Sequence, residues 1–171
     1  FERAQSIAAG DKVKLRAAVG IAVLWTDDER FAEAEAALRS VLTAGDLMES
    51  PELSREALRA LARVLLRQSR HDDALDLLLR EVRAAPADAE CWALLARVHS
   101  ATGDCRAAVT AASTALEAAN RHPSSRAKML ACRAMGVAQH GLGDATRARE
   151  WCERARRAAA AAHLPLAARR L

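Results

Sequence analysis

Arginine recurs at every fourth position in one segment of the sequence, at Arg55, Arg59, Arg63 and Arg67. Residues four apart are neighbours on a helix surface, so these side chains share one face if the segment is helical. Like charges at this spacing cost about 0.2–0.5 kcal/mol per pair, and some interaction must offset that cost. Guanidinium groups bind carboxylates and phosphates through two parallel hydrogen bonds. The series therefore indicates a surface for an anionic partner group.

A second interpretation of the same arginines needs no partner. Their aliphatic stems can cover apolar surface while the charged groups stay in water. Glu52, Glu56 and Glu90 would screen the charged groups, and exposed pairs of this kind contribute little to stability. The sequence alone leaves both interpretations open.

Residues suited to catalysis or metal binding do not cluster in the sequence. It contains no Gly-rich phosphate loop, no H-E-x-x-H and no G-x-S-x-G. The histidines are scattered, and no two cysteines form a C-x-x-C pair. We therefore expect no enzyme activity, no cofactor and no metal site. The histidines lie at positions 71, 99, 122, 140 and 163, and the cysteines at 91, 105, 132 and 152.

The composition favours helices throughout. The 171 residues carry a net charge of +4, and Ala, Leu, Arg and Glu dominate while only 3% are aromatic. No run of alternating apolar residues predicts a strand, and no apolar run approaches the ~20 residues that cross a bilayer. We expect no membrane association, and the unpaired thiols fit a reducing cytoplasm. Nucleic acid is not expected either, because few aromatic side chains are present to stack on bases.

A repeated pair of small residues organises the chain. In each copy a small residue precedes an alanine by twelve positions, and the second members of the pairs lie 40, 34 and 40 residues apart. Such spacing predicts helix pairs that approach closely because no long side chain separates them. Ala115 should likewise meet the next helix pair. The pairs are Ala22 and Ala34, Ala62 and Ala74, Ala96 and Ala108, and Gly136 and Ala148.

The turns between the paired helices also resemble one another. They read "DDERF", "QSRHD", "TGDCR" and "LGDAT". Gly103 and Gly143 can adopt the left-handed conformation that ends a helix. Asp104 and Asp144 can then cap the helix that follows. The chain is thus predicted to be a series of helix hairpins.

This pattern resembles the tetratricopeptide repeat, a helix-turn-helix unit of about 34 residues. The resemblance implies an all-α fold, a right-handed α-solenoid of antiparallel helix hairpins, over the whole of 1–171. The repeats would be 15–48, 55–88, 89–122 and 129–162, with 1–14 ending a preceding repeat and 163–171 starting a following helix. The best match, 89–122, carries Trp92, Leu95, Ala96, Gly103, Asp104, Ala108 and Ala115 at the signature places of the family.

Three residues depart from the family pattern. His99 and Gln139 stand where a large apolar residue is usual, and Glu81 stands at a normally small, packed site. Two junctions, around "TAGDLMESPELS" and "NRHPSSRA", carry roughly six residues more than the family unit. Unit lengths near 40 are similar to those of large bacterial signalling regulators of the MalT type.

The resemblance also implies a function and a site. In the geometry of the family the first helices line a concave groove. That groove would bring together Arg59, Arg63, Arg67, Arg97 and Arg133 as a basic track. We expect a protein-interaction scaffold within a larger bacterial regulatory protein, binding an acidic peptide or partner helix in this groove. An effector-sensing domain that binds a small ligand is the alternative.

Overall fold

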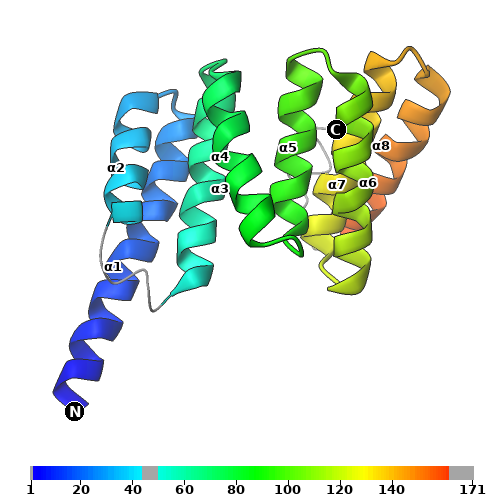
Figure 1. Ribbon diagram of the computed structural model, residues 1–171. Coiled ribbons are helices and arrows are strands. Elements are labelled where there is room, and N and C mark those ends of the chain that lie inside the picture. The colour runs from blue at the N-terminus through cyan, green and yellow to red at the C-terminus, as the bar shows by residue number, and fades with distance from the viewer. Residues whose placement is uncertain (1, 44–49, 162–171) are drawn as a thin grey trace. The chain divides into compact units, whose positions relative to one another are not determined.

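A computed structural model describes residues 2–43 and 50–161 of the chain (Figure 1). Eight helices and no strand occur in these residues. Clustering of the backbone contacts divides the chain into two compact units, residues 1–70 and residues 71–171. The all-helical prediction is confirmed for the described residues. The boundary between the units falls inside the predicted repeat 55–88.

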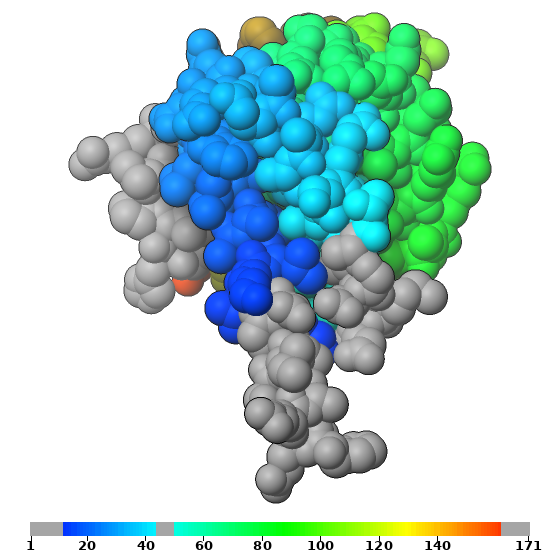
Figure 2. All heavy atoms as spheres, turned by 90° about the vertical axis from the view of Figure 1, so that its left-hand side faces the viewer, coloured from blue at the N-terminus to red at the C-terminus, as the bar shows by residue number. Residues whose placement is uncertain are grey.

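The first unit contains three helices that pack on one another. They are α1 (Glu2–Asp27), α2 (Phe31–Thr43) and α3 (Pro51–Arg67). Figure 2 shows α1 and α2 side by side on the face toward the viewer. Their interface is built from short and branched side chains, because Val19, Ala22, Ala34 and Leu38 are all almost completely buried.

Helix α1 is longer than the sequence analysis predicted. Residues 1–14 were expected to end a preceding repeat, with a new repeat starting at residue 15. Instead, α1 runs from Glu2 to Asp27 without a break and passes through Gly10. A single glycine costs a helix only about 1 kcal/mol, so the good helix formers around it can carry the helix onward. The predicted start of a following helix, 163–171, lies outside the described residues.

The second unit contains five helices, and those that follow one another run in opposite directions (Figure 1). They are α4 (His71–Ala84), α5 (Ala89–Ala101), α6 (Cys105–Arg121), α7 (Ser125–Gly141) and α8 (Ala145–Ala161). Each helix packs on the next, and α5 also packs on α7. Among the described residues, α6 and α8 have no backbone contact with each other. Helix α7 therefore lies between them and separates them.

The turns of the hairpins share one unusual backbone conformation. In the part of the chain that the structure describes, four residues have positive φ angles, and they lie 40, 34 and 40 positions apart, as the small-residue pairs do. The conformation costs a glycine little but strains other residues. The predicted left-handed glycines and the repeat spacing are thereby confirmed. The four residues are Glu29 (φ 62°), Ser69 (φ 59°), Gly103 (φ 84°) and Gly143 (φ 84°).

Aspartates cap the later helices as predicted. The Asp104 carboxylate accepts a hydrogen bond from the backbone N–H of Ala107 at 3.0 Å. The Asp144 carboxylate accepts one from the N–H of Arg147 at 2.9 Å. Each cap satisfies an N–H group that has no partner within the first helical turn.

Small residues form the helix contacts of the second unit. Ala96 of α5 and Ala108 of α6 are fully buried, and these two helices pack together. Ala115 of α6 packs with Ala93 of α5 and Ala131 of α7, so it does meet the next hairpin. Ala62 of α3 and Ala74 of α4 are also fully buried.

Candidate protein-interaction surfaces

The arginine series of the first unit lies along α3. Arg59 and Arg63 are half-buried and Arg67 is exposed. The guanidinium group of Arg67 lies 3.7 Å from a carboxylate oxygen of Glu29 and 5.7 Å from the centre of the Phe31 ring. These contacts tie the end of α3 to the turn before α2. Arg67 therefore has a structural partner that the sequence analysis did not foresee.

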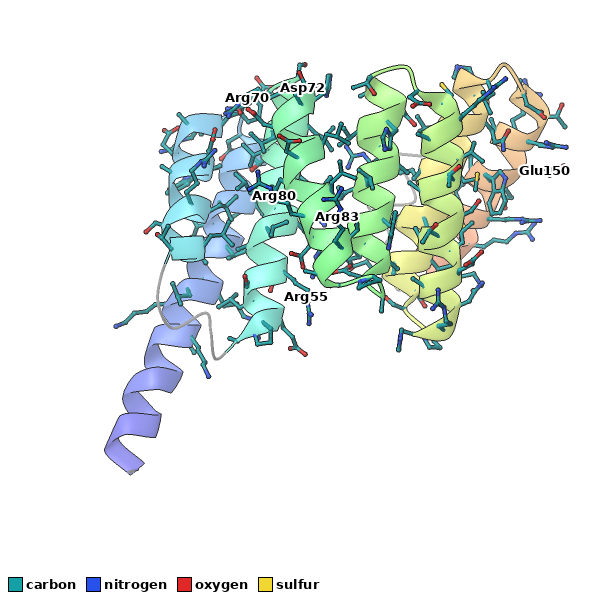
Figure 3. The ribbon with its side chains drawn as sticks, viewed as in Figure 1. Arg55, Arg70, Asp72, Arg80, Arg83 and Glu150 are labelled. Carbon is teal, nitrogen blue, oxygen red and sulfur yellow. The ribbon has the colours of Figure 1, made fainter. Side chains whose placement is uncertain are left out.

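A second arginine strengthens the same junction. The Nη1 group of Arg70 donates a hydrogen bond to Oε2 of Glu35 on α2 at 2.7 Å. Figure 3 shows Arg70 just beyond α3, next to α2. Glu35 also accepts hydrogen bonds from Arg39, one turn further along α2. This carboxylate thus connects α2 with the end of the arginine-bearing helix.

The second unit holds the other two predicted arginines. Arg97 lies on α5 and Arg133 on α7, and both are half-buried. These two helices pack together, and Arg126 of α7 forms an ion pair with Glu90 of α5 at 3.3 Å. Because the five predicted arginines are divided between the two units, a continuous basic track stays a prediction.

A groove that the sequence analysis missed runs along α6, α7 and α8. Helix α7 forms its floor, and α6 and α8 form its walls, since the backbones of these two helices do not contact each other in the described residues. It contains two adjoining pockets of about 600 Å³ and about 330 Å³, and Trp151 and Arg154 line both. We call this feature the α6–α8 groove.

The larger pocket is strongly basic. Its lining includes the cations Lys128, Arg154 and Arg157, and no carboxylate. Arg157 also lies 3.4 Å from the Glu153 carboxylate in an exposed pair, which is weak because water screens it. The apolar part of the lining comes from Leu116, Cys132, Trp151, Ala158 and Ala161.

The smaller pocket has a mixed charge. Arg147 and Glu150 line it together with the shared Arg154, and Figure 3 shows Glu150 pointing outward from α8. Gln139, one of the departures from the family pattern, also lines this pocket, and its amide contacts the sulfur of Met135 at 3.9 Å. The positive charge of the groove is therefore concentrated at the end where α8 finishes.

Trp151 and Arg154 form the boundary between the two pockets. The guanidinium carbon of Arg154 lies 4.4 Å from the centre of the Trp151 ring, a distance at which the cation is attracted to the ring face. The ring thereby orients a charge that would otherwise move freely in water.

The Cys132 thiol lies on the floor of the larger pocket. Burial raises the pKa of this thiol, while Lys128 and Arg154 act in the opposite direction by favouring the thiolate. Lys128 and Arg154 therefore affect the protonation of the Cys132 thiol as well as the charge of the pocket lining. Burial is the larger effect, so Cys132 is kept in its neutral form.

The sequence carries a signal for this groove that the sequence analysis did not identify as a site. Arg154 and Arg157 belong to the cluster "RARRAAAAA". The residues that line the groove recur at helical spacing on α8, at 147, 150, 151, 154, 157, 158 and 161. These residues line a groove only because the backbone of α6 does not contact the backbone of α8.

Other kinds of site are not present among the described residues. No group of His, Cys, Asp and Glu side chains there could hold a metal ion. No helix in that part of the chain is long and apolar enough to span a bilayer. None of the four cysteines, all of which lie in the described residues, forms a disulfide, and Cys91 and Cys132 are buried.

Comparisons with known proteins agree with this architecture. A sequence profile described as tetratricopeptide repeat matches residues 26–89 and 94–163. A crystal structure of the MamA protein is 17% identical, with a TM-score of 0.56, over 91% of this chain and 78% of the MamA chain. A MamA mutant structure is 17% identical, with a TM-score of 0.54, over 92% and 91%. No curated protein matches the sequence significantly.

Proposed function

This chain belongs to the tetratricopeptide repeat family, whose helical repeats are scaffolds for protein–protein interaction, and on that premise we propose that it binds an acidic peptide or partner helix. The predicted fold class, all-α with antiparallel helix hairpins, agrees with the family and with the MamA structures. The similarity to the MalT type stays a prediction. We place the protein in a bacterial regulatory system of the cytoplasm.

One observation carries the proposal. Arginines recur on α3, α5 and α7, which are the first helices of the predicted repeats 55–88, 89–122 and 129–162. Arg59, Arg63, Arg97 and Arg133 are half-buried, so part of each side chain is open to a partner while packing holds the helix backbone in place. A guanidinium group fixed in this way favours planar carboxylates. An acidic segment is the partner chemistry that fits best.

Charge reversal tests this proposal within each unit. The chain would be immobilised and a captured partner identified by mass spectrometry. Its affinity would then be compared for Arg59→Glu/Arg63→Glu and for Arg97→Glu/Arg133→Glu. The matched control is Arg80→Glu/Arg83→Glu, which reverses two exposed charges on α4 (Figure 3). We expect weaker binding by the first two variants and unchanged binding by the control. If the two test variants bind the partner as tightly as the original chain does, these arginines are not part of the binding site.

Sensing of a small effector is the competing proposal. It requires a pocket that encloses its ligand. The larger pocket of the α6–α8 groove has a suitable volume, about 600 Å³. However, its lining includes exposed residues such as Asn120, Lys128 and Arg157, which leave it open to water. Such a surface suits a polypeptide segment better than a buried metabolite.

A further inference from the structure

We propose that the α6–α8 groove is a second binding surface, and that its ligand is an extended acidic peptide segment carrying an apolar side chain. This surface is separate from the arginines of the proposed function. Arg97 and Arg133 do not line it, and none of its lining residues belongs to α3 or α5. The proposal therefore adds a surface whose walls are the second helices α6 and α8.

The shape of the groove favours an extended chain. All three helices contribute a stripe of lining residues along most of their length: α6 from Val109 to Asn120, α7 from Ser125 to Gln139, and α8 from Arg147 to Ala161. At a rise of about 1.5 Å per residue, the stripe on α8 is roughly 20 Å long. An extended peptide covers that distance with about six residues.

The charge of the groove selects an acidic segment. Lys128, Arg154 and Arg157 approach the larger pocket from α7 and α8, and no carboxylate lines that pocket. Its positive charge is unbalanced within the lining, so carboxylates on a partner would be attracted there. Glu150 lies at the other end of the groove, in the smaller pocket. The acidic residues of the ligand should therefore bind near the C-terminal end of α8.

The apolar lining supplies an anchor for a side chain. Leu116, Cys132 and Ala158 surround the larger pocket, and the Trp151 ring adjoins them. Aromatic and aliphatic anchors that fill such pockets commonly provide most of the affinity of an interface. Arg154 rests on the Trp151 ring, so a single element presents both apolar surface and a positive charge. A leucine beside a glutamate would satisfy both.

A peptide array provides the test. The full chain would be incubated with octapeptides in which glutamate and leucine occupy every combination of positions among serines. A matched array would carry lysine in place of glutamate. The tightest acidic peptide would then be titrated into the chain, and the indole N–H signal of Trp151 would be followed by NMR. That signal is assigned with Trp151→Phe.

The variants separate groove binding from general charge attraction. Lys128→Glu/Arg157→Glu reverses two charges in the groove, and Arg106→Glu/Arg149→Glu reverses two exposed charges on α6 and α8 outside it. We expect the groove variant to bind the acidic peptide at least tenfold more weakly, and the control variant to bind within about twofold of the original chain. Because the reversed side chains are exposed, thermal melts should confirm that both variants fold.

Several results would overturn the proposal. These are equal binding of the acidic and lysine arrays, equal peptide affinity of the groove variant and the original chain, or a Trp151 signal that peptide leaves unmoved. Inorganic phosphate or a single-stranded oligonucleotide that shifts the Trp151 signal more strongly than any peptide would assign the groove to another ligand class. Failure here leaves the test of Arg59, Arg63, Arg97 and Arg133 unaffected.

Discussion

Gly136 of α7 lies directly against Cys152 of α8. A Cβ atom at residue 136 would stand 3.2 Å from the Sγ atom of Cys152 and 3.4 Å from the backbone oxygen of Ala148. The predicted pair of Gly136 and Ala148 is therefore a true point of contact. Its lack of a side chain lets the backbones of α7 and α8 approach closely.

We expect Gly136→Leu to lower the free energy of unfolding by about 1–3 kcal/mol, because the new side chain must displace Cys152 or the α8 backbone. Urea denaturation followed by circular dichroism measures the change. Gly20→Leu is the matched control, since nothing lies within 4 Å of the corresponding Cβ position. Equal stability of the two variants would contradict the close contact of α7 and α8.

Ala108→Leu should also overpack its hairpin, at a cost of about 1–3 kcal/mol. Ala108 is fully buried on α6, at the position that the repeat spacing assigns to the contact with α5. Thr110→Leu on the exposed face of the same helix should change stability far less. A melting temperature of Ala108→Leu equal to that of the original chain would count against the assigned register.

Ser69→Gly should stabilise the chain by about 0.5–1 kcal/mol. Ser69 has a φ angle of 59°, and the left-handed conformation costs a non-glycine residue about 1–2 kcal/mol. The greater freedom of glycine in the unfolded chain cancels part of that gain. The same substitution inside α6, Ser113→Gly, should be destabilising. Urea titration distinguishes the two, and a loss of stability at position 69 would refute the strain argument.

The raised pKa of Cys132 predicts a specific pH dependence. Burial favours its neutral thiol, so its alkylation by iodoacetamide should accelerate only at a higher pH than in the unfolded chain. Its contribution to stability is complete below the unfolded pKa of about 8.5 and is lost as the pH rises through the folded value. Mass spectrometry of the modified peptides measures the rate.

Lys128→Ala offers an independent check of that prediction. Lys128 favours the thiolate of Cys132, so removing it should raise the pKa of the thiol further and slow the alkylation at a given pH. Cys105, at the start of α6, does not line the pocket and serves as the internal reference. Faster alkylation of Cys132 in this variant would show that access, and not charge, controls the reaction.

The repeat architecture could be predicted because each copy carries its own local signals. The turn glycines and the capping aspartates Asp104 and Asp144 act within a few residues of chain, and the small-residue spacing is a property of single helix pairs. Such signals do not depend on long-range geometry. The expected boundary between residues 14 and 15 came from the resemblance and not from a local signal, and α1 runs through it without a break.

The sites were harder to predict because they depend on contacts between distant residues. The spacing of the arginines on α3 was visible, but the ion pair between Arg67 and Glu29 joins residues 38 positions apart. The α6–α8 groove exists only because α7 separates its two walls. No periodicity within α8 alone distinguishes a wall of a groove from a solvated face. The five-arginine track remains a prediction for the same reason.

The interior of α5–α8 consists largely of alanine, with Ala93, Ala115 and Ala131 at its centre. A buried alanine loses no rotamer freedom when the chain folds, so this interior forms at a low cost in side-chain entropy. Because the alanine side chain is a single methyl group, folding also removes comparatively little apolar surface from water. The heat capacity increment of unfolding grows with the apolar area that becomes hydrated. The stability of this unit should accordingly vary only gently with temperature, and the protein should tolerate cold better than a chain whose centre is filled with leucine and phenylalanine.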